Sequence, residues 1–341
     1  MSGYADPVGR ADDLRAEVTR RLDELVDGLG EDAAPGKIYV GWFDAADVAG
    51  CPTRFRAAGT EGWDFPGWSP QTAGGTVGRA ALARYLDRNV TPAAAAPGAD
   101  PALPHPLDAV KQWMREARGT PTSSIAEWVT KLWRFGERAD LAATAALATR
   151  WVAGFVRVLG WPLPEGLALV VDDPGSPSAR RGTPPWRPRL AARRVPVTIG
   201  SKPDAVIGTV APSGGFDVVF HRPNSGDELA LTERAAFEAT AAALAIGIVP
   251  RDVVLTTADT GEKLRFPVRD DLLDCGVRLA VDVVRQRLRA SEPLAPGVAE
   301  HDDAVPSAAC RYCPERATCP PGLAWLDRPG RWHNGLPVLA G

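Results

Sequence analysis

The sequence lacks a long hydrophobic run, a strong net charge and more than a few cysteines. No apolar run approaches the roughly 18 residues that a membrane-spanning helix needs. The opening segment MSGYADPVGRADD also lacks the charged-then-apolar layout of a signal peptide. A net charge of −3 gives the whole molecule no attraction to nucleic acid or to an anionic membrane, so such binding requires a local patch. These absences predict a cytoplasmic protein without a membrane partner.

The composition and hydrophobic patterning predict a globular protein of the mixed α/β class. With 45% apolar residues among 341, the chain can bury one large core or two modest ones. Helical periodicity is expected over residues 11–28, about 76–88, 107–160, 231–246 and about 270–290. Short β-rich runs are expected at residues 37–43, 167–172, 195–199, 204–210 and 216–221, then in DVVLTTA and LRFPV, with a hairpin turn at PSGG, 212–215.

These elements divide the chain into five segments. They are an N-terminal helix (1–36), a segment with an isolated cysteine and a first core helix (37–90), a helical insertion (91–165), an α/β core (166–300) and a cysteine-rich segment with a tail (301–341). In the insertion, Trp113, Trp128, Trp133 and Trp151 have spacings suited to packing between helices. We therefore expect these tryptophans in the core rather than on a base-stacking surface.

The cysteines are the strongest chemical signal. In the cytoplasm thiols stay reduced, so clustered cysteines indicate a metal site rather than disulfides. Cys310 and Cys313 are separated by two residues, and Cys319 can close a third corner. A fourth ligand must come from Cys51, which precedes Pro52 at the edge of a loop, or from Cys275, which lies in an apolar helical stretch. The loop position favours Cys51.

The spacing of the cysteines also indicates which group they would bind. Structural zinc sites usually combine two close pairs of ligands, whereas this chain offers one distant cysteine and a C-x2-C-x5-C segment. That asymmetry favours an iron–sulfur cluster, such as [4Fe-4S], over zinc.

The two cysteine motifs, CPTRF at residues 51–55 and CRYCPERATCP at 310–320, resemble the iron–sulfur staple of RecB-like nucleases of the PD-(D/E)XK superfamily. That staple occurs in AddB and in the CRISPR-adaptation exonucleases. The likeness covers roughly residues 37–325, with the helical block as an insertion. It implies a restriction-endonuclease-like core, a cluster held by Cys51, Cys310, Cys313 and Cys319, DNA as a partner, and a helicase or another nuclease as a possible protein partner.

The resemblance also implies a metal-dependent hydrolase site, and three of its four motifs are altered. Gly78 stands where the family has a histidine, while Asp204 fits the aspartate that opens a strand. The E-x-K pair of the next strand falls on Val219 and His221, or on Phe220 and Arg222, in the other register. The Q-x-x-x-Y motif survives only as Glu233-x-x-x-Phe237. One carboxylate makes a poor magnesium site, so the sequence favours a nuclease fold that has lost catalysis and binds DNA or scaffolds a partner.

Two alternatives stay open. Asp204, Asp217 and His221, with Glu228 or Glu233, could rebuild a Mg²⁺ or Mn²⁺ site of an active DNA exonuclease, because Asp217 and His221 share a strand face. The chain could instead be a zinc-stabilised interaction protein.

Residues 179–203 form the most basic stretch and contain no acidic residue. Arginine side chains pair with phosphates, and Trp186 can stack on an unpaired base. The stretch predicts contact with single-stranded DNA or DNA ends through Arg187, Arg189, Arg193, Arg194 and Lys202.

Overall fold

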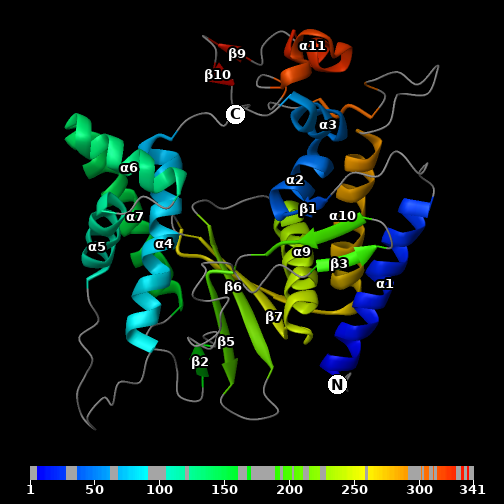
Figure 1. Ribbon diagram of the computed structural model, residues 1–341, viewed down its shortest axis with the longest axis horizontal. Coiled ribbons are helices and arrows are strands. Elements are labelled where there is room, and N and C mark those ends of the chain that lie inside the picture. Colours follow the sequence, from blue (N-terminus) through cyan, green and yellow to red (C-terminus); the bar gives the residue numbers. More distant parts are fainter. Residues whose placement is uncertain are drawn as a thin grey trace.

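The computed structural model describes residues 6–27, 37–61, 68–90, 105–119, 123–159, 167–169, 189–192, 195–201, 203–209, 215–222, 228–257, 260–290, 301, 303–306, 310, 313–327, 332–333 and 336–337. Five strands among these residues form a mixed sheet in the middle of the molecule, in the order β2-β5-β6-β7-β8 (Figure 1). They are β2 (Leu167–Leu169), β5 (Ala205–Thr209), β6 (Phe216–Arg222), β7 (Asp252–Thr257) and β8 (Lys263–Pro267). Only β6 and β7 run parallel; the other neighbours are antiparallel. The predicted mixed α/β class is confirmed.

One face of this sheet is covered by α9 (Glu228–Ile246), while α1 (Pro7–Asp27) and α10 (Asp270–Arg289) pack on α9 and extend the same core. Val218 and Phe220 of β6 point into this core because alternate side chains of a strand share a face. The helices α9 and α10 pack very closely at Gly276, where an added Cβ would lie 2.2 Å from the carbonyl oxygen of Ala236.

The opposite face is covered by the helices of the predicted insertion together with α4 (Figure 1). They are α4 (Pro70–Val90), α5 (Pro106–Gly119), α6 (Ser124–Phe135) and α7 (Arg138–Leu159). Val219 of β6 and Val254 of β7 point into this second core. The chain thus buries two cores, one on each side of the sheet.

A smaller three-stranded sheet, in the order β1-β4-β3, packs near α1 and α10. It consists of β1 (Ile38–Val40), β3 (Arg189–Ala192) and β4 (Val195–Ile199). The helices α2 (Trp42–Gly50) and α3 (Pro52–Glu61) follow β1. Near the C-terminus the elements are the 3-10 helix η2 (Pro314–Ala317), α11 (Pro320–Leu326), β9 (Trp332–His333) and β10 (Leu336–Pro337).

Several predictions of local structure need correction. The strand expected over 37–43 is shorter, since Trp42 and Phe43 begin α2. The run 195–199 is a strand, as predicted, but it lies in the smaller sheet, and part of the basic stretch forms β3. Of the four tryptophans expected in the core, Trp113 and Trp151 are buried and Trp128 is half-buried, whereas Trp133 is exposed. The hairpin turn at 212–215 has only Gly215 among the described residues.

By length and composition alone, α7 could cross a membrane over Arg138–Val158. The same helix packs against α4 and contributes Trp151, Val152 and Phe155 to the second core. Since 39% of this apolar stretch is buried inside the protein, burial accounts for part of its apolar character.

Candidate functional site

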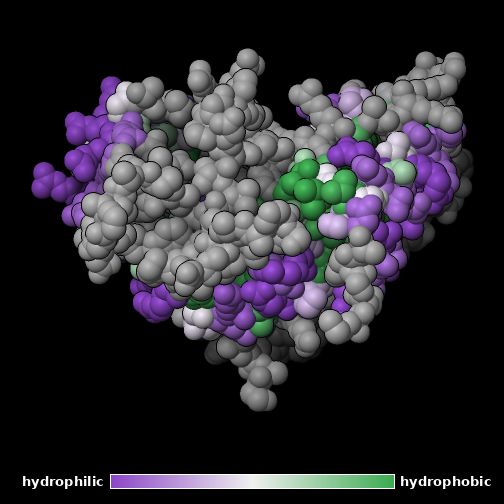
Figure 2. Space-filling model, turned by 90° about the horizontal axis from the view of Figure 1, so that it is seen from below, coloured by the Kyte–Doolittle hydropathy of each residue, from purple (hydrophilic) through white to green (hydrophobic). Residues whose placement is uncertain are grey.

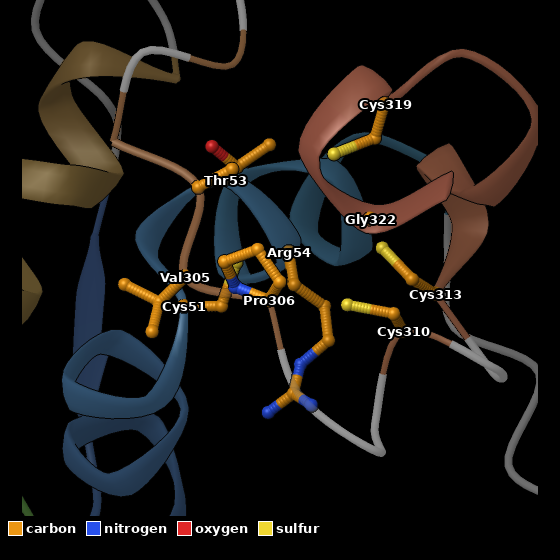
Figure 3. Close-up of a pocket in the computed structure, with 10 residues that line it drawn as sticks. Cys51, Thr53, Arg54, Val305, Pro306, Cys310, Cys313, Cys319 and Gly322 are labelled. Atoms are coloured by element: carbon orange, nitrogen blue, oxygen red, sulfur yellow. The ribbon is translucent and has the colours of Figure 1, made fainter. Parts of the chain in front are cut away.

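Four cysteines from the two ends of the chain line one pocket. Cys51 lies between α2 and α3, whereas Cys310, Cys313 and Cys319 belong to the C-terminal segment. Figure 3 shows the sulfur atoms of the last three turned toward the middle of the pocket. The pocket is completed mainly by Thr53, Arg54, Ala304, Val305, Pro306 and Gly322. The space between these side chains, its opening to solvent included, is about 370 Å³.

Three of the four cysteines precede a proline that begins a helix. Cys51 precedes Pro52 of α3, Cys313 precedes Pro314 of η2, and Cys319 precedes Pro320 of α11. Proline is well suited to a first helical position, because its fixed φ matches the helix and its missing N–H would lack a partner there. The repeated Cys-Pro pair thus places each thiol at the start of a helix, facing the pocket.

Phe55, the last residue of the CPTRF motif, holds Cys51 in place through its packing. It lies one turn after Cys51, whose carbonyl oxygen accepts a hydrogen bond from the Phe55 N–H at 3.1 Å. Its ring is buried in the first core, and the Arg287 guanidinium of α10 lies 4.2 Å from the ring centroid. This packing anchors α3, and with it Cys51, to the core.

The thiols lie near enough to influence one another. The pKa of Cys313 is raised by burial and, less strongly, by Cys51, Cys310 and Cys319, while a hydrogen bond from the Glu315 backbone opposes the rise. At Gly322, an added Cβ would lie 3.3 Å from the Cys319 sulfur and 3.6 Å from the Cys310 sulfur. A glycine here leaves the space beside two thiols open.

A polar clasp joins the same two chain segments beside the pocket. The Arg56 guanidinium donates to both Asp303 carboxylate oxygens, at 2.5 and 2.7 Å, and to the Gln286 side-chain oxygen at 2.8 Å. The Thr53 hydroxyl donates to Asp303 at 2.7 Å. These bonds, those from Arg56 foremost, lower the pKa of Asp303. The protein itself therefore holds α3 against the C-terminal segment.

Cys275 does not join this pocket. It lies half-buried on α10 beside the first core, and its sulfur accepts a 3.5 Å hydrogen bond from Arg278. None of the five cysteines forms a disulfide within the described residues. Within the described ranges, no group of three or more His, Cys, Asp or Glu side chains is arranged to hold a single metal ion.

Asp204, the one expected catalytic aspartate that fits its motif, forms an ion pair with Arg79. The Asp204 carboxylate has a fully buried side chain and accepts a 2.7 Å hydrogen bond from the Arg79 Nε of α4. Its second oxygen accepts a 2.7 Å bond from the His221 backbone N–H and a longer one, at 3.5 Å, from Arg79. A cationic side chain of the protein thus lies where a metal ion would neutralise this carboxylate.

Gly78 has a packing role in the same place. A Cβ added to it would lie 3.0 Å from the Trp151 side chain, and one added to Gly74 would lie 2.6 Å from the Leu147 Cβ. The two glycines let α4 and α7 approach closely. A histidine at position 78, which the resemblance would require as a metal ligand, would collide with the Trp151 side chain of α7.

His221 is buried and turned away from Asp204. Its Nδ1 lies 2.6 Å from the Thr256 hydroxyl and its Nε2 lies 3.0 Å from the Trp151 carbonyl oxygen, with the Trp151 and Phe155 rings edge-on to it. Burial lowers the pKa of His221 to about 4, so the ring is neutral near pH 7. Because a carbonyl only accepts, the Nε2 carries the hydrogen and Nδ1 accepts from Thr256.

Asp217 lies at the other end of β6. Its carboxylate accepts hydrogen bonds from Arg251 at 3.0 Å and from Arg265 at 3.1 Å. Arg265 also pairs with Asp252, the residue opposite Asp217 on β7. The structure therefore does not bring the side chains of Asp204, Asp217 and His221 together.

Sequence reasoning missed Arg79 and a second buried carboxylate, Glu238 of α9. Glu238 accepts a 2.5 Å hydrogen bond from the Ser201 hydroxyl, and the Arg234 Nε lies 4.0 Å away. Burial raises the pKa of Glu238 to about 7. A lone acid within the apolar helical run AAFEATAAALA was the signal that could have identified it.

The remaining candidates lie largely outside the described residues. This applies to Arg187, Arg193, Arg194 and Lys202, while Arg189 begins β3 without a described side chain. Glu228 begins α9, again without a described side chain, and Glu233 is half-buried on the same helix.

Comparison with known proteins adds no relative, since neither the protein-family models nor the curated proteins contain a match to this chain.

Proposed function

We propose that this protein is an iron–sulfur protein with a RecB-like nuclease fold that binds DNA, or scaffolds a helicase or nuclease partner, without cutting DNA. The order of elements supports this proposal: α4, the helical block, strands β5 and β6, α9 and then β7. This is the order that the resemblance implies for a PD-(D/E)XK core with an insertion. The role would lie in DNA repair, recombination or defence in the cytoplasm.

The proposal that the protein does not cut DNA rests on one observation, the pairing of Asp204 with Arg79. Metal-assisted phosphodiester hydrolysis needs carboxylates with free oxygen atoms to hold Mg²⁺ or Mn²⁺. Both Asp204 oxygens accept hydrogen bonds from the protein, and Trp151 fills the space beside Gly78. A metal ion would have to displace a guanidinium from a buried ion pair, which is costly.

The cysteine pocket fits an iron–sulfur cluster in its donor chemistry. Cys51, Cys310, Cys313 and Cys319 would supply four thiolates, the usual complement for such a cluster. When bound, the cluster would supply a covalent cross-link between the N- and C-terminal segments, in the same place as the clasp of Arg56 and Asp303. The spacing of the cysteines, one distant thiol and a C-x2-C-x5-C segment, favours an iron–sulfur cluster over zinc, whose structural sites usually combine two close pairs of ligands.

The test combines DNA binding with DNA cleavage. End-labelled single-stranded DNA is incubated with the protein and Mn²⁺, then run on native and on denaturing gels. The proposal predicts a shifted band on the native gel and a full-length strand on the denaturing gel. Shortened products that disappear in Asp204→Asn would establish the exonuclease instead. If no shift forms at any protein concentration, DNA is not the ligand.

A further inference from the structure

The corner between α6 and α7 exposes two aromatic side chains. Phe135 is 70% exposed, the highest value among the large hydrophobic residues of the described part, and Trp133 is 43% exposed. Burial of a large apolar side chain stabilises a fold, so these two exposed side chains add less to the stability of the fold than buried ones would. Both residues belong to the last turn of α6, which lies at the edge of the molecule in Figure 1.

The backbone of this corner is fixed by hydrogen bonds. Gly136 has a φ of 72°, in the left-handed region, and its N–H donates to the Trp133 carbonyl oxygen at 3.4 Å. The Glu137 N–H donates to the Leu132 carbonyl oxygen at 3.0 Å, and the Arg138 N–H donates to Gly136 at 2.8 Å. This glycine-capped helix end holds Phe135 between two helices without a long loop. A ligand would therefore meet aromatic rings on a backbone that is already ordered.

Cationic residues flank the aromatic pair in the sequence, and one from α5 contacts it. Lys131, Arg134 and Arg138 are exposed and form no ion pair within the described ranges. The Arg118 guanidinium of α5 lies 5.3 Å from the centroid of the Trp133 ring. Glu137 is the one acidic residue between positions 131 and 138. The surface on the side of α5 and α6 is accordingly hydrophilic (Figure 2).

We infer that this corner, formed by Arg118 and residues 131–138, is a docking surface for single-stranded nucleic acid. Unpaired bases would stack on Phe135 and on the exposed part of Trp133, and Lys131, Arg134 and Arg138 would pair with phosphates. A duplex fits less well, because its bases are already stacked on each other and offer no free face. The inference rests on the proposed DNA binding and adds a contact distinct from the basic stretch at 179–203.

The test measures binding of fluorescein-labelled oligo(dT) by anisotropy for the full-length protein and four variants. Phe135→Ala should weaken binding between about 5-fold and about 150-fold, the range of one lost base–aromatic stack. Phe135→Trp should retain wild-type affinity. Leu229→Ala is the matched control, because Leu229 is 69% exposed on α9 and should not affect binding. Replacing Lys131 and Arg134 together by Gln should reduce the salt slope of log K by about 1.4.

The contrary outcomes separate this inference from the proposed function. If Phe135→Ala binds oligo(dT) like the wild type while Arg193→Glu with Arg194→Glu loses binding, the corner is not the docking surface although DNA binding stands. If Phe135→Ala impairs binding of polyglutamate but not of oligo(dT), the corner binds an acidic protein. If the wild type binds no oligo(dT), the proposed DNA binding fails as well.

Discussion

Asp204 shows how a single side chain decides between a metal site and a structural ion pair. The carboxylate is fully buried and depends on Arg79 for charge compensation, although Arg79 itself is partly exposed. We expect Arg79→Met to lower the free energy of unfolding by about 1.5–3 kcal/mol, the range for a hydrogen bond to a charged group. Urea unfolding measures this change.

The double variant provides the control for that prediction. Asp204→Asn removes the charge that Arg79 compensates, so Arg79→Met should cost less in the Asp204→Asn background than in the wild type. Equal costs in both backgrounds would mean that the guanidinium and the carboxylate do not interact.

The buried Glu238 should make the stability of the protein depend on pH. Its pKa is raised to about 7 from an ordinary value of 4.5, mainly by burial, so the folded state holds a proton that the unfolded state has released between these pH values. The stability of the wild type should therefore fall as the pH rises through this window. Glu238→Gln cannot ionise and should escape this loss.

The measurement is the difference in unfolding free energy between Glu238→Gln and the wild type at about pH 5 and about pH 8. The variant should gain on the wild type at the higher pH. His221 acts in the opposite direction, because its lowered pKa costs stability as the pH falls, but it is present in both proteins and cancels. A difference that does not change with pH would show that Glu238 stays ionised in both states.

Residue types predicted part of the site and missed the rest. Cysteine chemistry and the loop position of Cys51 were enough to group it with Cys310, Cys313 and Cys319, and the structure places these four around one pocket. The pair of Asp204 and Arg79 spans 125 residues, and no local pattern connects them. Asp217 and His221 lie on one strand as expected, yet four residues at about 3.3 Å each separate them, and each bonds to a different element.

At the scale of elements, the contact between α4 and α7 depends on glycine. Adjacent glycines of α4 offer a matched pair, since a Cβ on Gly74 would lie 2.6 Å from the Leu147 Cβ and a Cβ on Gly75 would meet nothing within 4 Å. Gly74→Ala should destabilise the protein by about 1–3 kcal/mol through overpacking. Gly75→Ala should stabilise it by about 0.5–1 kcal/mol, because alanine is the better helix former.

Thermal unfolding followed by circular dichroism compares the two variants directly. Opposite shifts of the melting temperature are expected. Equal shifts would mean that α4 and α7 do not pack as closely as described.

The long helices and most of the short strands, such as β4, β5 and β6, were predictable from their patterns, whereas the short helices α2 and α3 were missed. The helices α1, α9 and α10 follow their apolar periodicity within a few residues. After Lys37 the run IYVGWF has no charged residue, so its period cannot separate strand from helix, and α2 was missed. α4 begins at Pro70, earlier than expected, where Ser69 caps the helix by accepting a 3.3 Å hydrogen bond from the Thr72 N–H.

At the scale of the whole molecule, the main feature is the contact between an N-terminal segment and the C-terminal segment. The clasp of Thr53, Arg56 and Asp303 and the four-cysteine pocket lie side by side and join α3 to the C-terminal segment. A cross-link between positions so distant in sequence restricts the unfolded chain and thereby stabilises the folded one. The proposed nuclease fold, and with it the proposed DNA binding, depends on this pocket holding an iron–sulfur cluster.

Iron and acid-labile sulfide per chain, measured on anaerobically purified protein, test that claim most directly. Cys275→Ser is the matched control for Cys51→Ser, because Cys275 lies outside the pocket. The wild type and Cys275→Ser should each contain about four iron and four sulfide and absorb broadly near roughly 400 nm, while Cys51→Ser should lose the iron and unfold at a lower temperature. Colourless wild-type protein with one zinc per chain, or full iron content in Cys51→Ser, would contradict the account.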